Sequence, residues 1–400
     1  METVDQDFLD SLVSSKCTIQ QISDKLQEKY PNVDGLSKRS VERFFAQNGI
    51  SRRNTLDEET VDNIVRDAVS KIGKQPGRRY VKGYLESQGN SSLSERQIGK
   101  SLNRIDPVSH TDRYHGVVRQ TNPIPYSADY FGQNLHMDQN EKLVNYGVTI
   151  VAAIDGFSGF VTRAVTMPVK NNLIIYDKVF RESILQFGLF DQVIVDCGRE
   201  FNLCLAVQQS LQGFRRNTLV APYKQIKSTK NNRIERVWVE VNSRVGYPVK
   251  AALVEMETDG ILDMANNTHR FCCSEAAQAV VTEGLHRLVQ SRNHHFVPGR
   301  GKPVDLLARN GAMPISAASV PDVGVAAAQY QEAGGSLADV RSFGTDPLAN
   351  HPRKVAERSS KMNEYQTAVG DVYGKLANGD NDCFKYFVKR FMDITDELCH

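Results

Sequence analysis

Three acidic residues stand in contexts that would let them act together: Asp138 in "LHMDQN", Asp196 after the apolar run 193–195, and Glu235 in "NNRIERVW". The two aspartates lie on or just after predicted strands, and Glu235 lies one turn into a predicted helix. If the two strands are neighbours, both aspartates emerge at one edge of a sheet and the helix can lay Glu235 across it. Converging carboxylates repel one another unless cations neutralise them, so this arrangement predicts a metal site. Hard oxygen ligands favour Mg²⁺ or Mn²⁺, and two such ions can clamp the attacking and leaving oxygens of a phosphoryl displacement, with Asp138 bridging them.

Other acidic residues nearby have different interpretations. Asp155 begins the sequence "DGFSG", where a turn role is favoured over metal binding. Glu200 is expected to cap the start of a helix, where the helix dipole favours an acid. Glu240 is the second choice for the third ligand, but it lies five residues beyond Glu235 and on a different helical face.

Two residues without a carboxylate lie close to the three acids. His136 shares the face of Asp138 on the predicted strand and is expected either to touch the site or to touch only the core. Trp238 lies three residues after Glu235 and is expected to anchor its helix in the core.

The elements that must position these residues follow one another along the chain. Short β-like runs come first, and two of them are joined by a hairpin signal at 155–159. Predicted helices and strands then alternate, which is typical of a mixed α/β sheet covered by helices. The helices are expected at 171–188, 200–213 and 231–245, and the strands at 191–196 and 217–222.

The first hundred residues have helical periodicity and divide into two similar blocks, 1–55 and 56–106. Each block contains helices joined by a short Gly-containing turn, the layout of a helix-turn-helix unit. In the second block, Ser92 and Glu95 fit a capping box that opens the last helix. The exposed face of that helix is expected to contact DNA, although a plain helical bundle or a protein-binding unit fits the same pattern. The residues expected to contact DNA there are Arg96, Lys100 and Arg104.

Basic residues concentrate around the third acid, although the net charge of the chain is only +2. Residues 215–250 contain nine Lys and Arg residues and two acidic ones. Such a local excess suits a phosphate backbone, and a solvated charged surface is the alternative. The predicted DNA contacts in this stretch are Lys224, Lys227, Lys230, Arg233 and Arg236. No apolar run approaches the length of a membrane span, so no membrane association is expected.

The remaining segments carry less chemical information. Residues 107–131 are rich in turn-forming residues and are expected to form a linker. Helices are expected over 256–310, a weakly packed or mobile Ala/Gly-rich connector over 311–352, and a further helical segment over 353–400.

The chain from about 130 to 255 resembles the DDE integrase core of retroviral integrases and related transposases of eukaryotic mobile elements. The resemblance rests on the strand "HMD" (136–138), the hairpin "IDGFSG" (154–159), the strand end "DCGRE" (196–200) and the helix "RIERVW" (233–238). The intervals between the three acids are 57 residues (139–195) and 38 residues (197–234), and the second is slightly longer than the retroviral pattern. The loop "APYKQIKSTKNN" (221–232) is similar to the Pro-Tyr loop that borders the integrase active site.

The resemblance implies a ribonuclease H-like fold over 132–255, with a mixed five-stranded sheet flanked by helices, N-terminal helix-turn-helix units and C-terminal helices. It implies that Asp138, Asp196 and Glu235 hold Mg²⁺ or Mn²⁺, with two ions expected, for 3′-end processing and DNA strand transfer. The implied partners are element ends and target DNA, bound by a homo-oligomer in the nucleus.

Two other functions stay open at this point. Leu135, Gly159 and Cys197 depart from residues that are frequent in related elements. A host-retained DNA-binding protein with a silent core is therefore the alternative. A ribonuclease acting on RNA·DNA hybrids shares the metal chemistry but explains the N-terminal helical blocks poorly.

Overall fold

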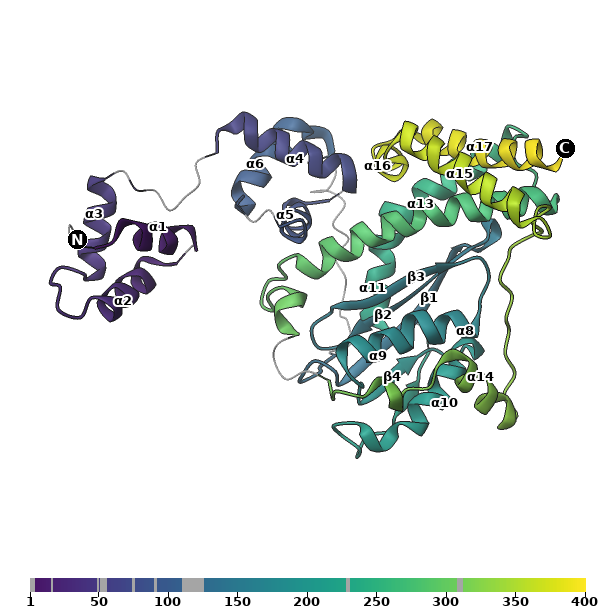
Figure 1. Cartoon of the computed structure of the whole chain (residues 1–400), viewed down its shortest axis with the longest axis horizontal. Helices are drawn as coiled ribbons and strands as arrows, with labels where there is room; N and C mark the ends of the chain where they lie inside the picture. The colour runs from purple at the N-terminus through teal and green to yellow at the C-terminus, as the bar shows by residue number, and fades with distance from the viewer. Residues whose placement is uncertain are drawn as a thin grey trace. The chain divides into compact units, whose positions relative to one another are not determined.

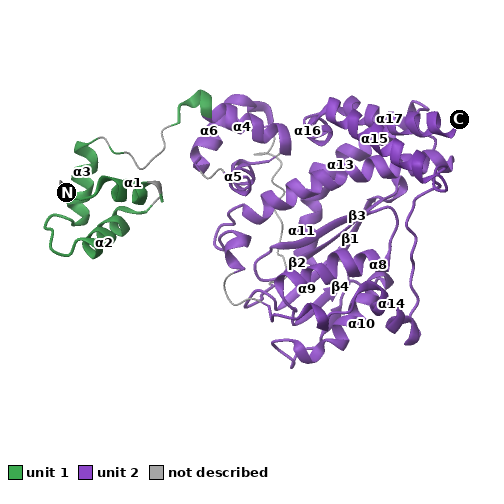
Figure 2. Cartoon of the chain, in the orientation of Figure 1, with its two compact units in different colours: residues 1–60 green, residues 61–400 purple. Residues whose placement is uncertain are grey.

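The structure is a computed structural model that describes residues 4–15, 17–48, 50, 56–73, 76–89, 92–109, 126–227, 231–307 and 312–400. The chain forms two compact units, residues 1–60 and 61–400, which Figure 2 distinguishes by colour. Figure 1 shows the helices and strands of both units.

The first unit is a small helical core built from α1 (Gln6–Ser14), α2 (Ile19–Lys29) and α3 (Lys38–Gln47). Ile22, Leu26, Val41 and Phe45 are buried between these helices, as the apolar stripes of the sequence predict. The side chain of Thr18 accepts a hydrogen bond from the backbone of Gln21 and so caps the start of α2.

The second helical block comprises α4 (Glu58–Ile72), α5 (Arg78–Ser87) and α6 (Glu95–Ile105). The predicted capping box of α6 is wrong by two residues. Ser94, not Ser92, is the N-cap, and its partner in the capping box is Gln97 rather than Glu95. Gln97 serves because a glutamine at the third helical position can return a hydrogen bond to the backbone N–H of the cap.

The centre of the second unit is a five-stranded sheet with the order β3-β2-β1-β4-β5. The strands are β1 (Asn134–Leu143), β2 (Val148–Asp155), β3 (Val161–Met167), β4 (Gln192–Val195) and β5 (Tyr223–Gln225). The first three strands form an antiparallel meander, and β4 and β5 run parallel to β1. The predicted mixed sheet is thereby confirmed, but the last strand begins after Pro222 instead of covering 217–222. Proline has no backbone N–H to donate to a neighbouring strand. The carbonyl of Pro222 accepts a hydrogen bond from the backbone N–H of Val193, and the pairing of β5 with β4 starts there.

Alternate residues of the strands enter two separate cores. On one face, Leu135, Met137 and Val193 pack against α8 (Asn172–Ile174), the π-helical segment η2 (Ile175–Arg181), α9 (Glu182–Phe187) and α10 (Asn202–Ser210). On the other face, Ile150 and Ala152 pack beneath a long helical segment and α13 (Asn267–His294). That segment consists of α11 (Asn232–Val241), the π-helical turn η6 (Asn242–Gly246) and α12 (Tyr247–Thr258). The sheet is therefore covered by helices on both faces.

Helix α13 packs on the sheet, on α5 of the second helical block and on α16 and α17 near the C-terminus. Its C-terminal half packs closely on α5, where the hydroxyl of Ser291 donates to the carbonyl of Tyr80 (2.7 Å). A β-carbon on Gly83 would stand 2.5 Å from the carbonyl oxygen of Ser291 and 2.8 Å from the amide nitrogen of His295. The second helical block thus depends on a glycine to lie this close to α13.

The C-terminal helices cover the opposite side of α13. They are α15 (Pro352–Val369), α16 (Val372–Ala377) and α17 (Asn381–Cys399). In Figure 1, α13 lies between them and the sheet. Phe384, Val388 and Ile394 of α17 are buried in the same core as the sheet residues of that face.

The Ala/Gly-rich connector contacts the core at a few points, while most of its described residues are exposed. Its backbone pairs with the core at Leu189 and Met313, and α14 (Val323–Glu332) packs on α10. The hydroxyl of Tyr176 donates to the carbonyl of Pro321 (2.6 Å). Small residues such as Ala312 and Ala326 are buried here because they allow the chain to lie flat on the core. No helix within the described residues is long and apolar enough to span a bilayer.

Candidate active site

The pairing of β1 with β4 brings the two predicted aspartates level with each other. His136 is the parallel partner of Ile194, and Asp138 and Asp196 each lie two residues further along their strands. In-register residues of parallel neighbours lie on the same face of a sheet, with the strands about 4.8 Å apart. Asp138 is buried and Asp196 is half-buried directly beyond the end of β4.

Helix α11 brings Glu235 to the same edge of the sheet. Burial is the main cause that raises the pKa of Asp138 to about 6, and the negative charges of Glu235 and Asp196 raise it further. Burial and Asp196 also raise the pKa of Glu235, while Lys142 opposes them. The three carboxylates are therefore close enough to interact electrostatically, although they come from three separated segments.

The three side chains suit divalent cations by their chemistry. All are hard oxygen donors, and the negative charges of Glu235 and Asp196, which add to the effect of burial on the pKa of Asp138, are charges that cations would neutralise. Among the described residues, no group of three or more His, Cys, Asp or Glu side chains is arranged to hold a metal ion. Repulsion between neighbouring carboxylates opposes such convergence.

Hydrogen bonds fix the orientation of both aspartates. The indole Nε1 of Trp238 donates to Oδ2 of Asp138 at 2.9 Å, and the amide of Gly198 donates to Oδ1 of Asp196 at 3.0 Å. The sequence predicted Trp238 only as a packing residue. Its position one helical turn after Glu235 was visible in the sequence, but the partner of its N–H was not.

His136 connects β1 to the start of α11. Its Nδ1 lies 2.7 Å from Oδ1 of Asn231, and its Nε2 lies 2.9 Å from the hydroxyl of Tyr126. Burial lowers the pKa of His136 to about 4, which fits a neutral ring that donates from one nitrogen and accepts at the other. Asn231 also donates to the carbonyl of Met137 (3.3 Å). His136 therefore has a structural role next to the acids, and its partner Asn231 was missed because it lies 95 residues further along the chain.

A second polar cluster holds the turn after β4. Gln139, the neighbour of Asp138, donates to the carboxylate of Glu200, and Lys170 lies 3.8 Å from the same carboxylate. Asn172 donates to the backbone carbonyls of Arg199 and Glu200. Glu200 does not cap its helix as predicted, because its side chain folds back over Gly198, where a β-carbon would lie 2.5 Å from the carboxylate.

The two other candidate acids have structural partners. Asp155 accepts hydrogen bonds from the backbone and hydroxyl of Ser158 and from the amide of Gly132, which confirms its predicted turn role. Glu240 forms an ion pair with Arg292 (2.6 Å) and is thereby separated from the three acids.

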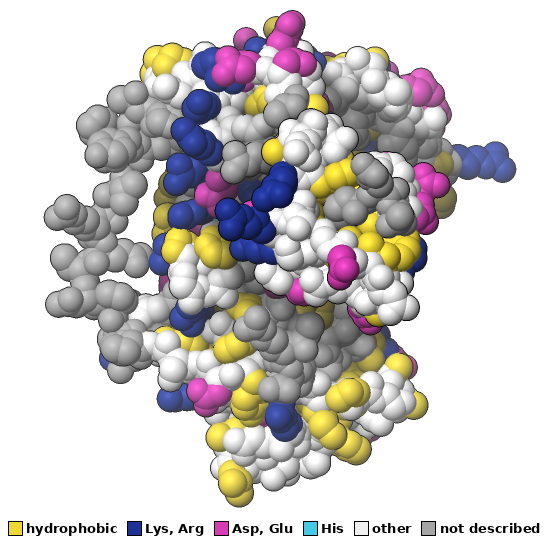
Figure 3. Space-filling model, turned by 90° about the vertical axis from the view of Figure 1, so that its left-hand side faces the viewer, with side chains coloured by type: hydrophobic (Ala, Val, Ile, Leu, Met, Phe, Trp, Pro, Cys, Tyr) yellow, Lys and Arg dark blue, Asp and Glu magenta, His cyan; other side chains and the backbone are white. Residues whose placement is uncertain are grey.

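The predicted DNA-contacting residues differ in their surroundings. Arg96 and Lys100 on α6, and Lys224, Lys227 and Arg236 near the acids, are exposed. Lys230 lies outside the described residues. Figure 3 shows Lys and Arg side chains exposed on the face that it presents.

Two of the predicted basic contacts have intramolecular partners. Arg104 forms a two-pronged ion pair with Asp62 of α4, with distances of 2.7 and 3.0 Å. The guanidinium of Arg233 lies 4.6 Å above the ring of Tyr126, and burial lowers its pKa. In the structure, both side chains therefore make contacts within the protein, and these contacts stabilise its fold.

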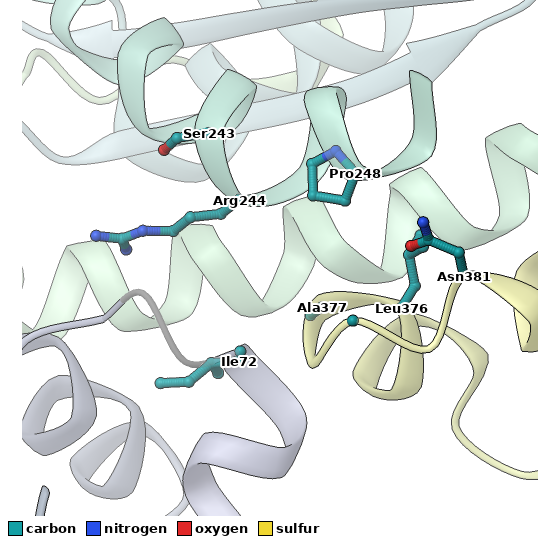
Figure 4. Close-up of a pocket in the computed structure, with 9 residues that line it drawn as sticks. Ile72, Ser243, Arg244, Pro248, Leu376, Ala377 and Asn381 are labelled. Carbon is teal, nitrogen blue, oxygen red and sulfur yellow. The ribbon is translucent and has the colours of Figure 1, made fainter. Parts of the chain in front are cut away.

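A pocket of about 250 Å³ lies apart from the acids, between α4, the η6–α12 junction and the C-terminal helices (Figure 4). Its lining contains no carboxylate, histidine or cysteine. It therefore offers none of the ligands or general bases that a phosphoryl transfer site requires. The lining residues are Ile72, Gly73, Ser243, Arg244, Pro248, Leu376, Ala377, Gly379 and Asn381.

Comparison with known families agrees with this geometry. Residues 126–309 match the family model of the integrase core domain, a stretch that includes all five strands and the three acids. No curated protein gives a significant match to the chain. The mixed five-stranded sheet flanked by helices is consistent with the ribonuclease H-like fold of such cores, and the match supports an integrase or transposase type of function. Residues 126–309 are therefore an integrase-like core domain.

Proposed function

We propose that this protein is a DNA integrase or transposase that catalyses metal-dependent 3′-end processing and strand transfer. The observation that supports this proposal best is the register of β1 and β4. Extended by two residues, that register would set Asp138 beside Asp196, and the effects of these acids on the pKa values of Asp138 and Glu235 support a common site.

The proposed reaction consists of two phosphoryl transfers. In the first, a water oxygen attacks a phosphorus near the end of the element, the bond to the 3′-oxygen breaks, and a free 3′-hydroxyl results. In the second, this hydroxyl loses its proton and attacks a phosphorus of target DNA, which releases a target 3′-oxygen. Each bond that breaks is replaced by a new one to the same phosphorus, so the reaction needs neither an oxidant nor a covalent protein intermediate.

The residues of the chain would bind and orient the reactants. Asp138, Asp196 and Glu235 would hold the divalent cations, two Mg²⁺ or Mn²⁺ ions. When bound, such ions stabilise charge on the attacking and leaving oxygens. Exposed Lys224, Lys227 and Arg236 are close in sequence to the acids and would contact the DNA backbone.

The wider setting of the reaction is also part of the proposal. The two N-terminal helical blocks would recognise element ends, with Arg96 and Lys100 as exposed contacts on α6. Two ends must be joined in one event, so the protein is expected to act as a homo-oligomer on DNA. Because its proposed substrate is DNA, the protein is expected to act in the nucleus.

The test is Asp138→Asn compared with the unaltered protein on oligonucleotides that carry the element ends. The variant is expected to lose Mg²⁺-dependent strand transfer and to retain DNA binding, because the amide has the same shape but less affinity for the cation. Asp177→Asn is the matched control, since Asp177 pairs with Lys178 and Arg181 in the helices of the opposite core. Both end joining and gel-shift affinity are measured.

The possible results separate the two functions. Strand transfer retained by Asp138→Asn would reject the assignment of the acids. Strong DNA binding without any metal-dependent nicking by the unaltered protein would favour the host-retained DNA-binding protein instead.

A further inference from the structure

Trp238 is the only tryptophan of the chain, and its N–H is directed at one of the three acids. The side chain is 5% exposed and Asp138 is 4% exposed, so water competes little for this hydrogen bond. Packing explains the burial of the ring, because Trp238 lies in the core with Val237 and Val241 of the same helix. Packing alone does not require a donor, and a phenylalanine would bury a similar apolar surface.

The hydrogen bond restrains the Asp138 carboxylate. A carboxylate that accepts from a fixed indole N–H cannot rotate freely about its last side-chain bond, and charge-assisted hydrogen bonds are the stronger kind.

The same bond links Asp138 to Glu235. Residues three apart on a helix lie on the same side, so Trp238 and Glu235 move together as parts of α11. A second link joins the start of α11 to β1 through Asn231 and His136, at 2.7 Å. The Trp238 bond differs from this link because it acts on the side chain that would bind the cations.

We propose that Trp238 is a positioning residue, whose indole N–H holds Asp138 in the orientation needed for divalent cations and couples that acid to Glu235. This inference rests on the proposed function, because it assigns the carboxylates to cation binding. It assigns Trp238 no contact with DNA or with the reacting atoms.

The experiment compares the unaltered protein with Trp238→Phe, which keeps an aromatic ring and removes the donor. Mn²⁺ binding measured by calorimetry is expected to weaken about tenfold in the variant. Strand transfer is expected to fall at low Mn²⁺ and to recover at saturating Mn²⁺, because the acids are still present. Val241→Ala is the matched control, since it disturbs buried packing on the same helix without touching Asp138, and its Mn²⁺ affinity is expected to stay unchanged.

A spectroscopic measurement reports on the bond itself. Because the chain has one tryptophan, ¹⁵N-labelled protein gives one indole N–H resonance. This resonance is expected to shift in Asp138→Asn and to broaden on stoichiometric addition of paramagnetic Mn²⁺.

The inference and the proposed function fail in different ways. Unchanged Mn²⁺ affinity in Trp238→Phe, or an equal loss in Val241→Ala, overturns the positioning role while leaving the proposed function intact. An indole resonance that does not respond to Asp138→Asn also overturns that role. No Mn²⁺ binding by the unaltered protein, with an indole resonance that still responds to Asp138→Asn, overturns the proposed function and leaves the hydrogen bond established.

Discussion

Two glutamates of one helix show how surroundings decide the role of identical side chains. Glu235 lies near Asp196, and both burial and this acid raise its pKa. Glu240, five residues later, pairs with Arg292, and the two side chains are 20% and 10% exposed. The first glutamate carries unfavourable repulsion, and the second neutralises a buried cation.

Glutamine substitutions should therefore have opposite effects at these two positions. Glu235→Gln is expected to abolish strand transfer without lowering the melting temperature in metal-free buffer, because it removes repulsion. Glu240→Gln is expected to lower the free energy of unfolding by about 2 kcal/mol, because it leaves Arg292 without its partner. Calorimetry and an end-joining assay on both variants check this, and loss of activity in both at unchanged stability would contradict it.

The sequence identified the acids because each stands in its own local pattern. Asp196 follows three apolar β-formers, and Glu235 lies one turn into an amphipathic helix. The hydrogen-bond partners of His136, next to the acids, could not be predicted in this way. Tyr126 and Asn231 reach His136 from opposite sides along the chain, and only the tertiary fold brings them together.

At the scale of elements, the contact between α5 and α13 decides whether the second helical block belongs to the core. Figure 1 shows α5 next to the C-terminal part of α13. The ring of Tyr80 stacks on His295 with centroids 5.0 Å apart, and the guanidinium of Arg244 lies 3.8 Å over the same Tyr80 ring. The block is thus held by side chains on α5, α13 and η6, with Gly83 at the closest approach.

Gly83→Ala should separate these helices. The added methyl group would meet backbone atoms of Ser291 and His295, which cannot move aside without moving α13. A loss of roughly 2 kcal/mol in the free energy of unfolding is expected from such overpacking. Gly99→Ala on α6 is the control, because its nearest neighbour is a flexible Arg78 atom at 3.4 Å. Alanine should be neutral or stabilising there by up to about 1 kcal/mol, and equal urea midpoints for the two variants would refute the prediction.

Element types were easier to predict than element boundaries. The helical stripes of the first hundred residues and the hairpin at 155–159 are local patterns, and both are present in the structure. The capping serine of α6 and the position of β5 were displaced by a few residues. Several serines can accept the capping bond, and a three-residue edge strand is defined by its partner β4 more than by its own sequence.

At the scale of the whole molecule, the last fifty residues complete the core of the second unit. Their sequence predicted amphipathic helices but indicated no catalytic or binding role for them. The structure places α17 against α12, α13 and α15, with Phe384 fully buried and Tyr386 on the surface. The C-terminal helices are thus part of the folding unit that carries the acids.

Phe384→Ala is therefore expected to destabilise the unit that carries the three acids from a position on a C-terminal helix. Removing a fully buried phenylalanine side chain costs about 3 to 5 kcal/mol. Tyr386→Ala, two residues away and 62% exposed, should leave the melting temperature nearly unchanged. Differential scanning calorimetry checks both variants, and an unaffected main transition in Phe384→Ala would show that the C-terminal helices fold separately.

The packing of α13 against α17 also affects how the protein folds while it is being synthesised on the ribosome. Residues 295–380, 86 in all, separate the end of α13 from the start of α17. At a synthesis rate of roughly 5 to 20 residues per second, the side of α13 that packs on α17 stays uncovered for about 4 to 17 s after α13 itself is translated. Nascent chains of this protein should therefore need chaperone protection during that interval.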